Sequence, residues 1–204
     1  MSQTAQPGAA FSPGRVKWKR FAYIMVPAAA VAATLVGLTA KGAIGANISV
    51  SGEEYLVTAT QLNAKGFEQF AKYDMQINGK RVPVIVSALR FATITNLCQA
   101  VPTGVGNISF ILTAGTGRTP VSASNLIVDA RALAGDARFT NIVIGQDAST
   151  LNEAPAIGAP GTFGQQADTV VIKHLVQHTW LTTAGTFTLP GLSLRVSTHG
   201  AFCP

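Results

Sequence analysis

Residues 55–62 read Tyr55-Leu56-Val57-Thr58-Ala59-Thr60-Gln61-Leu62, a run rich in β-branched and aromatic side chains. Such side chains pack well on a pleated surface and are enriched in strands. Similar runs follow along the chain, at residues 82–89, 91–98, 108–113, 126–132, 139–144, 169–176 and 192–196. Turn-forming clusters separate these runs, and the sequence after residue 47 lacks helical periodicity. We therefore predict a mainly β protein whose residues 47–204 form a single many-stranded all-β domain.

The arrangement of the predicted strands has two interpretations. Short strands at this spacing suit a sandwich of two sheets. A solenoid is the alternative, because residues 94–99 resemble residues 172–177, and Thr-Ala-Gly-Thr occurs at both 113–116 and 183–186. Within this domain Asn78-Gly79 stands between apolar neighbours. That pair predicts a hairpin with a type I′ turn.

The segment from Phe21 to Ala40 carries no charged residue. As a helix it would rise about 30 Å, which matches the hydrocarbon core of a bilayer. We predict that it is either a transmembrane signal anchor or the apolar region of a signal peptide. In the second case cleavage would fall between Gly42 and Ala46, within the small-residue region 41–46, which otherwise serves as a linker.

Basic residues before this segment set its predicted orientation. The positive-inside rule places residues 1–20, a predicted disordered basic tail, in the cytoplasm and residues 47–204 outside. We expect the domain at the outer face of the cytoplasmic membrane, in the cell envelope, or secreted if the chain is cleaved. The residues that determine this topology are Arg15, Lys17, Lys19 and Arg20.

The formal net charge of +6 follows the same division of the chain. All acidic residues lie after residue 46, where they nearly balance the basic ones. A domain that is close to neutral has no basic surface for a phosphate backbone. We therefore expect no nucleic-acid partner.

The two cysteines, Cys98 and Cys203, both lie in the part predicted to be exported. Disulfides form and persist outside the cytoplasm. We predict that these two residues form a disulfide, which would tie the C-terminus to the middle of the domain.

Catalytic and metal-binding patterns are not recognised in the sequence. Gly191-Leu192-Ser193 lacks the second glycine of a hydrolase nucleophile elbow. His174 and His178 lie in a predicted strand, about 13 Å apart, which is too far for one metal ion. We predict no catalytic, cofactor or metal site.

Several motifs resemble those of an uncharacterised actinobacterial envelope family. They are Arg15-Val16-Lys17-Trp18-Lys19-Arg20-Phe21 and the runs at 92–99, 141–148, 161–168 and 184–189. Members form a domain of unknown function, and some carry the automatic label "cholesterol esterase". The resemblance implies a multi-span membrane protein as a partner, and it supplies no catalytic residue.

Three functions follow from these observations. The first is a non-enzymatic, membrane-anchored envelope protein with a structural or binding role, which assembles with copies of itself or with a membrane partner. The second is a carrier of a lipid or another apolar ligand, because 48% of the residues are hydrophobic and charges are few. The third, an esterase, follows only from the family label.

Overall fold

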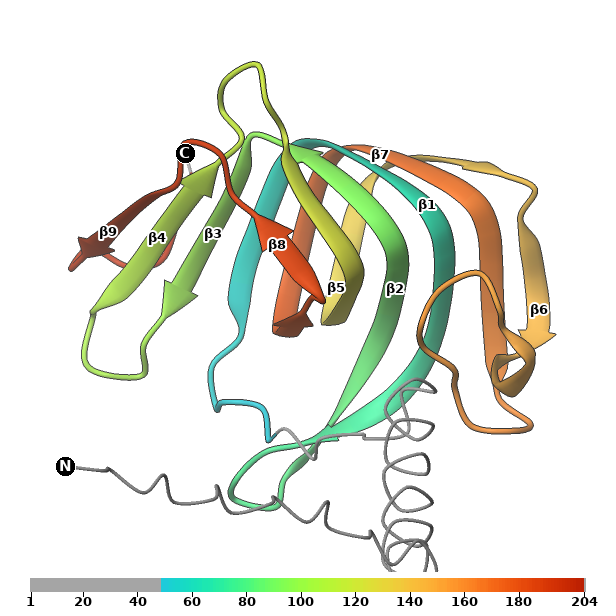
Figure 1. Ribbon diagram of the computed structural model, residues 1–204. Helices are drawn as coiled ribbons and strands as arrows, with labels where there is room; N and C mark the ends of the chain where they lie inside the picture. Colours follow the sequence, from blue (N-terminus) through green and yellow to red (C-terminus); the bar gives the residue numbers. More distant parts are fainter. Residues whose placement is uncertain (1–48, 204) are drawn as a thin grey trace, which may run out of the picture. The chain divides into compact units, whose positions relative to one another are not determined.

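The computed structural model describes residues 49–203. The predicted membrane segment Phe21–Ala40 and the four basic residues before it lie outside this range. The described chain forms nine strands and one 3₁₀ helix, η1, with no α-helix among residues 49–203 (Figure 1). The elements are β1 (Tyr55–Met75), β2 (Arg81–Thr95), β3 (Leu97–Pro102), β4 (Ser109–Ala114), β5 (Val121–Thr140), β6 (Val143–Asp147), η1 (Ala148–Thr150), β7 (Phe163–Thr183), β8 (Thr186–Thr188) and β9 (Ser193–Ser197).

The prediction of a mainly β domain is confirmed. All nine strands belong to one sheet, in the order β6-β7-β5-β2-β1-β3-β4-β9, with β8 paired to β5. Every pairing between these strands is antiparallel. The sequence left a sandwich and a solenoid open, and the structure instead has one continuous sheet. Residues 49–203 contain no helix that is long and apolar enough to cross a membrane.

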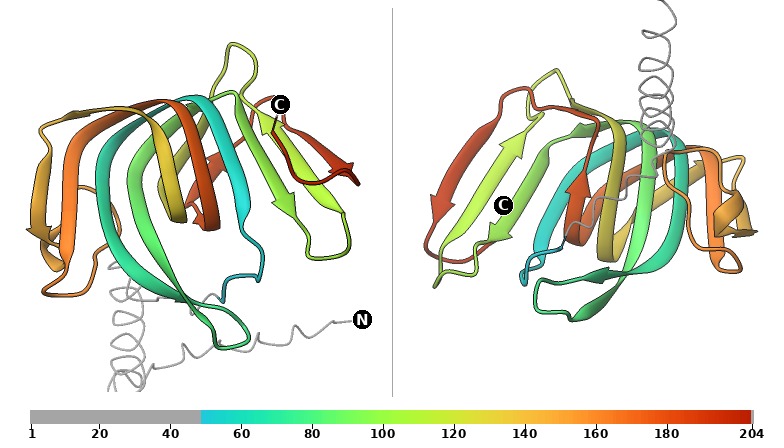
Figure 2. Two further views of the ribbon diagram at one scale, coloured as in Figure 1. Left: turned by 180° about the vertical axis from the view of Figure 1, so that it is seen from behind. Right: turned by 60° about the horizontal axis from the view of Figure 1, so that its bottom comes forward.

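An additional pairing between β7 and β1 closes part of this sheet on itself. Strands β1, β2, β5 and β7 then form a ring in which each strand pairs with two other members of the ring. Figures 1 and 2 show these four strands as a strongly curved arch, with β3, β4 and β9 projecting from one side. We call these three projecting strands the wing.

Three of the ring strands are unusually long. β1 and β7 have 21 residues each and β5 has 20, whereas strands commonly have about 3–10. These long strands contain residues with positive φ, such as Gly66 in β1 and His174 in β7, at which the strand bends and then continues. The sequence predicted two strands at 126–132 and 139–144. The first run lies within β5, but the second is divided between the end of β5 and the start of β6, because β5 continues through Gly135, at an irregularity in its pairing with β7.

The β1–β2 hairpin forms as predicted, but its turn type differs. Type I′ needs positive φ at both turn residues, and only Gly79 has it, at +83°. The N–H of Gly79 donates to the carbonyl oxygen of Gln76 at 2.9 Å, and the N–H of Gln76 donates to the carbonyl oxygen of Lys80 at 2.9 Å. These bonds define a three-residue loop with a left-handed glycine, in which Asn78 Oδ1 also accepts from the N–H of Lys80.

Two apolar clusters make up the core of the ring. The larger cluster collects residues from β1 to β5 and from β7, among them Phe67, Leu97 and Val170. The second cluster lies on the other face of β2, where Val84 and Val86 pack with residues of the loop after β6, including Leu151. Along β1 the division between the two clusters falls between Phe67, which joins the first, and Phe70, which joins the second.

A disulfide joins Cys98 in β3 to Cys203, as predicted, with the two Cα atoms 5.9 Å apart. Both residues pack with Ala100 and Ile111 on one face of the wing. The bond closes a sequence separation of 105 residues. It therefore holds the C-terminal segment against that face.

Candidate functional site

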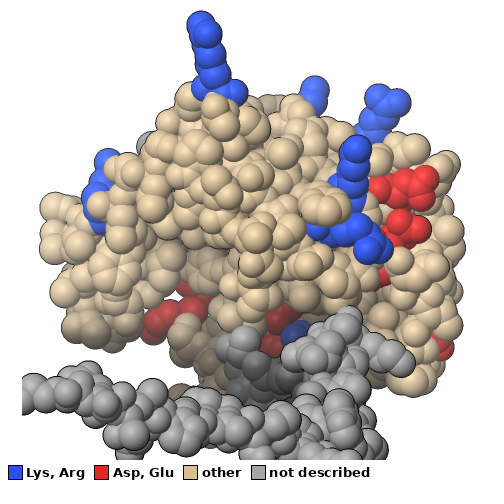
Figure 3. Space-filling view, in the orientation of Figure 1, with Lys and Arg blue, Asp and Glu red and all other residues tan. Residues whose placement is uncertain are grey.

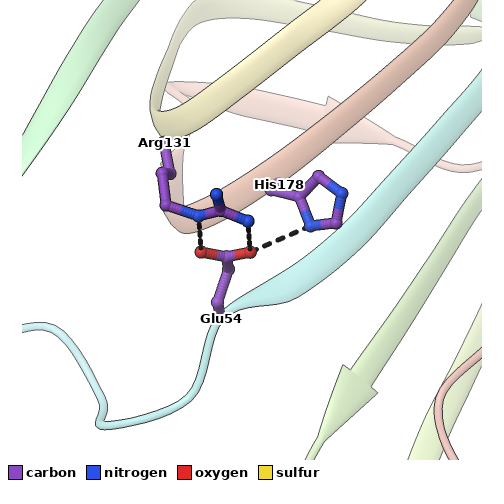
Figure 4. Close-up of polar contacts among 3 residues, drawn as sticks. All are labelled: Glu54, Arg131 and His178. Carbon is purple, nitrogen blue, oxygen red and sulfur yellow. Dashed lines mark hydrogen bonds and ion pairs between the residues drawn. The ribbon is translucent and has the colours of Figure 1, made fainter.

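A group of three polar side chains meets where β1 begins (Figure 4). Arg131 of β5 donates from Nε and from its second terminal nitrogen to Glu54, at 2.6 and 2.9 Å. His178 of β7 places Nδ1 2.9 Å from the same carboxylate. The hydrogen bond from Arg131 is the main reason that the pKa of Glu54 is lowered. A carboxylate held ionised in this way orients its partners and is a poor proton acceptor.

A nucleophilic site would need a hydroxyl or thiol group beside His178 in addition to this group. An imidazole held by a carboxylate can serve as a base when its other nitrogen faces a hydroxyl or thiol. Among residues 49–203, no hydrogen bond joins His178 to a serine, threonine or cysteine. Ser193, the serine of the incomplete elbow, opens β9 and pairs with Thr113 in β4. The group therefore links β5 and β7 to Glu54, the residue that precedes β1.

A second polar cluster lies on the face of the second apolar cluster. Lys72 Nζ lies 3.0 Å from Asp74 Oδ1 and 2.9 Å from Asp129 Oδ2. Asp129 is buried, with only 2% of its surface exposed. Burial raises the pKa of Asp129 to about 6, and the ammonium of Lys72 opposes this shift. Burial acts to lower the pKa of Lys72, but the two carboxylates together outweigh it and raise that pKa.

The buried carboxylate of Glu68 holds a loop in place. Glu68 is fully buried on β1, and its Oε1 accepts a hydrogen bond of 2.7 Å from the N–H of Ala154. Burial raises the pKa of Glu68. Arg90 of β2 donates from Nε to the carbonyl oxygen of Glu153 at 2.9 Å. The loop between η1 and β7 is thus fixed to β1 and β2 by two side chains that the sequence analysis did not single out.

The two histidines considered for metal binding have different partners. His174 Nδ1 lies 2.8 Å from Asp136 Oδ2 at an exposed position, while His178 contacts Glu54. Within the part of the chain that the structure describes, no three His, Cys, Asp or Glu side chains are grouped to hold a metal ion. Asp147 caps η1, since its Oδ1 accepts from the N–H of Ser149 at 2.9 Å.

The most distinctive surface feature is the uncovered face of the wing. Gln99, Leu112 and Leu194 are aligned across β3, β4 and β9, next to buried Val57 of β1. The neighbouring row consists of Val101, Phe110 and Val196. Exposure increases outward, from 6% at Val57 to 62% at Leu194 and Val196. We call this surface the wing face. It continues the side of the sheet that lines the core, but no other element among the described residues covers it.

The opposite face of the wing is different. Cys98, Ala100 and Ile111 are buried there beneath the C-terminal segment that the disulfide holds. On β9, Arg195 alternates with the two exposed apolar residues and so lies on this opposite face. Figure 3 shows few charged side chains over the β4 and β9 side of the view. The two rows of the wing face thus contain no charged residue, and Gln99 is their one polar member.

Comparison with known proteins adds a family to this description. Residues 51–204 match the model of DUF6230, a family of unknown function. The chain belongs to this family. The DUF6230 match covers every strand of the structure and confirms the resemblance to an uncharacterised domain. No curated protein and no solved structure matches the chain.

Proposed function

We propose that this DUF6230 member is a non-enzymatic component of the cell envelope that pairs with a second copy of itself through the wing face. The observation that carries the proposal is the exposure of Phe110, Leu194 and Val196 on a face that elsewhere lines the core. Large apolar side chains grouped on one surface indicate a contact with another surface. The membrane segment predicted at Phe21–Ala40 would hold the domain in the envelope.

A second copy is the partner that the chemistry of the wing face favours. The face has no charged residue that would select a partner of opposite charge. Two apolar sheet faces pack about 10 Å apart with interdigitated side chains, as in a sandwich. A two-fold axis between two wings would bring Leu194 and Val196 of both copies into one such layer.

The size of the wing face sets the expected affinity. Three strands about 4.8 Å apart, with six residues in β3, six in β4 and five in β9 at about 3.3 Å per residue, cover roughly 270 Å² per copy. Stable interfaces bury about 800 Å² of accessible surface per partner, so this contact would be weak in free solution. Confinement of both copies to one membrane raises their effective concentration and favours the pair.

The two rival functions have less support. The hollow inside the larger apolar cluster, lined by Leu62, Ile94 and Leu175 among others, has a volume of about 30 Å³. Pockets for ligands of ordinary size measure about 300–1,000 Å³, so the hollow inside this cluster is too small for a lipid, whereas an open surface hollow beside Ala64, Phe91 and Val170 measures about 650 Å³. The arrangement of Glu54, Arg131 and His178 gives no support to the esterase hypothesis.

Crosslinking of the full chain in its own membranes tests the proposal. Leu194→Cys introduces one thiol on the wing face, because the two native cysteines are joined to each other. Arg195→Cys is the matched control, since it places a thiol on the opposite face of the same strand. A short bis-maleimide is expected to yield dimers with Leu194→Cys alone. Dimers from both variants, or from neither, would overturn pairing through the wing face.

A further inference from the structure

The tip of the β1–β2 hairpin exposes large apolar side chains at its outermost point. Ile77 is 87% exposed, and Tyr73 and Met75 before it are also exposed. These side chains contribute nothing to either core cluster. A hairpin in water is normally closed by small polar residues, so this tip is unusual for a fully hydrated loop.

Cations flank this apolar tip. Lys80 and Arg81 follow the turn, and the guanidinium of Arg81 lies 4.6 Å from the centre of the Tyr73 ring. Asp74 is the acidic residue of the tip, and it is buried against Lys72. The exposed charges of residues 73–81 are therefore positive. An apolar point between an aromatic ring and cations suits the boundary between acyl chains and anionic headgroups.

The N-terminal end of the described domain, around Val50, lies beside this hairpin. The N–H of Val50 donates to the carbonyl oxygen of Met75 at 3.0 Å, and Val50 forms a bridge with Gln76. Ten residue-to-residue steps lead from Ala40, the end of the uncharged segment, to Val50. Fully extended, they span at most about 36 Å, so a membrane-inserted segment would keep the hairpin close to the bilayer.

A second loop with apolar side chains lies at the same end of the domain. The β3–β4 loop carries exposed Val105 and Ile108. In Figure 1 and in the reverse view of Figure 2, this loop and the β1–β2 hairpin lie at the same end, opposite the loop between β4 and β5. Both loops can therefore face one surface at the same time.

We propose that the β1–β2 hairpin, residues 73–81, docks on the membrane by inserting Ile77 into the headgroup region of an anionic bilayer. Lys80 and Arg81 contact lipid phosphates, while Tyr73 lies at the interface. This inference rests on the membrane anchorage in the proposed function and not on the pairing of copies. The hairpin then gives the domain a second contact with the bilayer, which fixes the orientation of the domain above it.

A fluorescent label on the full chain tests this docking. The chain carrying Ile77→Cys is labelled with an environment-sensitive dye and reconstituted into vesicles of phosphatidylglycerol and phosphatidylcholine. The control is Thr119→Cys, an exposed position in the loop at the opposite end. We expect the label at position 77 to shift to the blue and to lose emission when brominated lipids are included. The label at position 119 should respond only to aqueous iodide.

The possible results separate the hairpin from the anchor and from pairing. Co-flotation of the chain with vesicles, without lipid quenching at position 77, would overturn the hairpin proposal and leave the anchor intact. Protection of position 77 from iodide without lipid quenching would also overturn it and would indicate a protein partner at the tip. Failure to co-float would overturn the anchor and the hairpin docking together. The crosslinks at Leu194 report on pairing independently.

Discussion

Lys72 and Asp129 belong to strands that are not neighbours, yet Nζ of the lysine lies 2.9 Å from Oδ2 of the aspartate. β2 runs between them, with Val84 opposite Lys72 and Val86 opposite Asp129. Lys72 therefore reaches across a neighbouring strand to a carboxylate that is buried beside valines. Burying a charge is costly unless it is paired, and one cation here serves two carboxylates.

Asp129→Asn is expected to change how stability depends on pH. In the native state burial raises the pKa of Asp129 to about 6, so the folded chain retains a proton that the unfolded chain releases near its ordinary value of 3.8. Stability from this group is thus present below pH 3.8 and is lost as the pH rises towards 6, by up to about 3 kcal/mol. Asparagine does not ionise, so the variant does not lose stability in this way as the pH rises.

Urea unfolding of the native chain and of Asp129→Asn between pH 4 and 7.5 measures the effect. The free energy of unfolding of the variant should increase relative to that of the native chain as the pH rises. Two pH profiles that run parallel would contradict the raised pKa of Asp129.

Glu68→Ala should loosen the loop between η1 and β7. The N–H of Ala154 would lose its acceptor in a buried place, which costs about 1–3 kcal/mol. Glu68→Gln keeps an acceptor oxygen and should cost less. Hydrogen exchange at Ala154 and the unfolding free energy of both variants test this order. Equal losses in the two variants would mean that the carboxylate does not hold the loop.

Gly66→Ala should be markedly destabilising. Gly66 has a φ of +68°, and an added Cβ would lie 2.3 Å from the carbonyl oxygen of Glu153. The left-handed backbone costs about 1–2 kcal/mol for a non-glycine residue, and the collision adds to it. Gly79→Ala is the control, because its φ is +83° and nothing lies within 4 Å of the added atom. The midpoint of thermal unfolding should be much lower for Gly66→Ala than for Gly79→Ala. A similar decrease in both variants would contradict the close approach of residue 66 to the carbonyl oxygen of Glu153.

Replacing both cysteines with serine should lower stability while the sheet is retained. In the chain-entropy view a loop of about 100 residues contributes about 4.7 kcal/mol, and native strain reduces that figure. The C-terminal segment should then leave the buried face of the wing around Ile111. Limited proteolysis after Ser197, compared with that of the native chain, measures this release. Unchanged cleavage would show that packing alone holds the segment.

The sequence by itself determined the β class, the position of most strands and turns, and the disulfide. These features depend on local composition, as at Tyr55–Leu62, or on the compartment predicted for Cys98 and Cys203. Alternation of apolar residues shows that a strand exists and which side is buried. It contains no information about which strand is its partner.

Only the tertiary structure decided the closure of β7 on β1, the continuation of β5 through Gly135 as far as Thr140, and the meeting of Lys72 with Asp129. Each depends on contacts between residues far apart in the chain, which no local pattern encodes. The wing face is the same kind of feature. Leu194 and Val196 read as ordinary strand residues, and their exposure arises because the wing projects past the elements that cover the rest of the sheet.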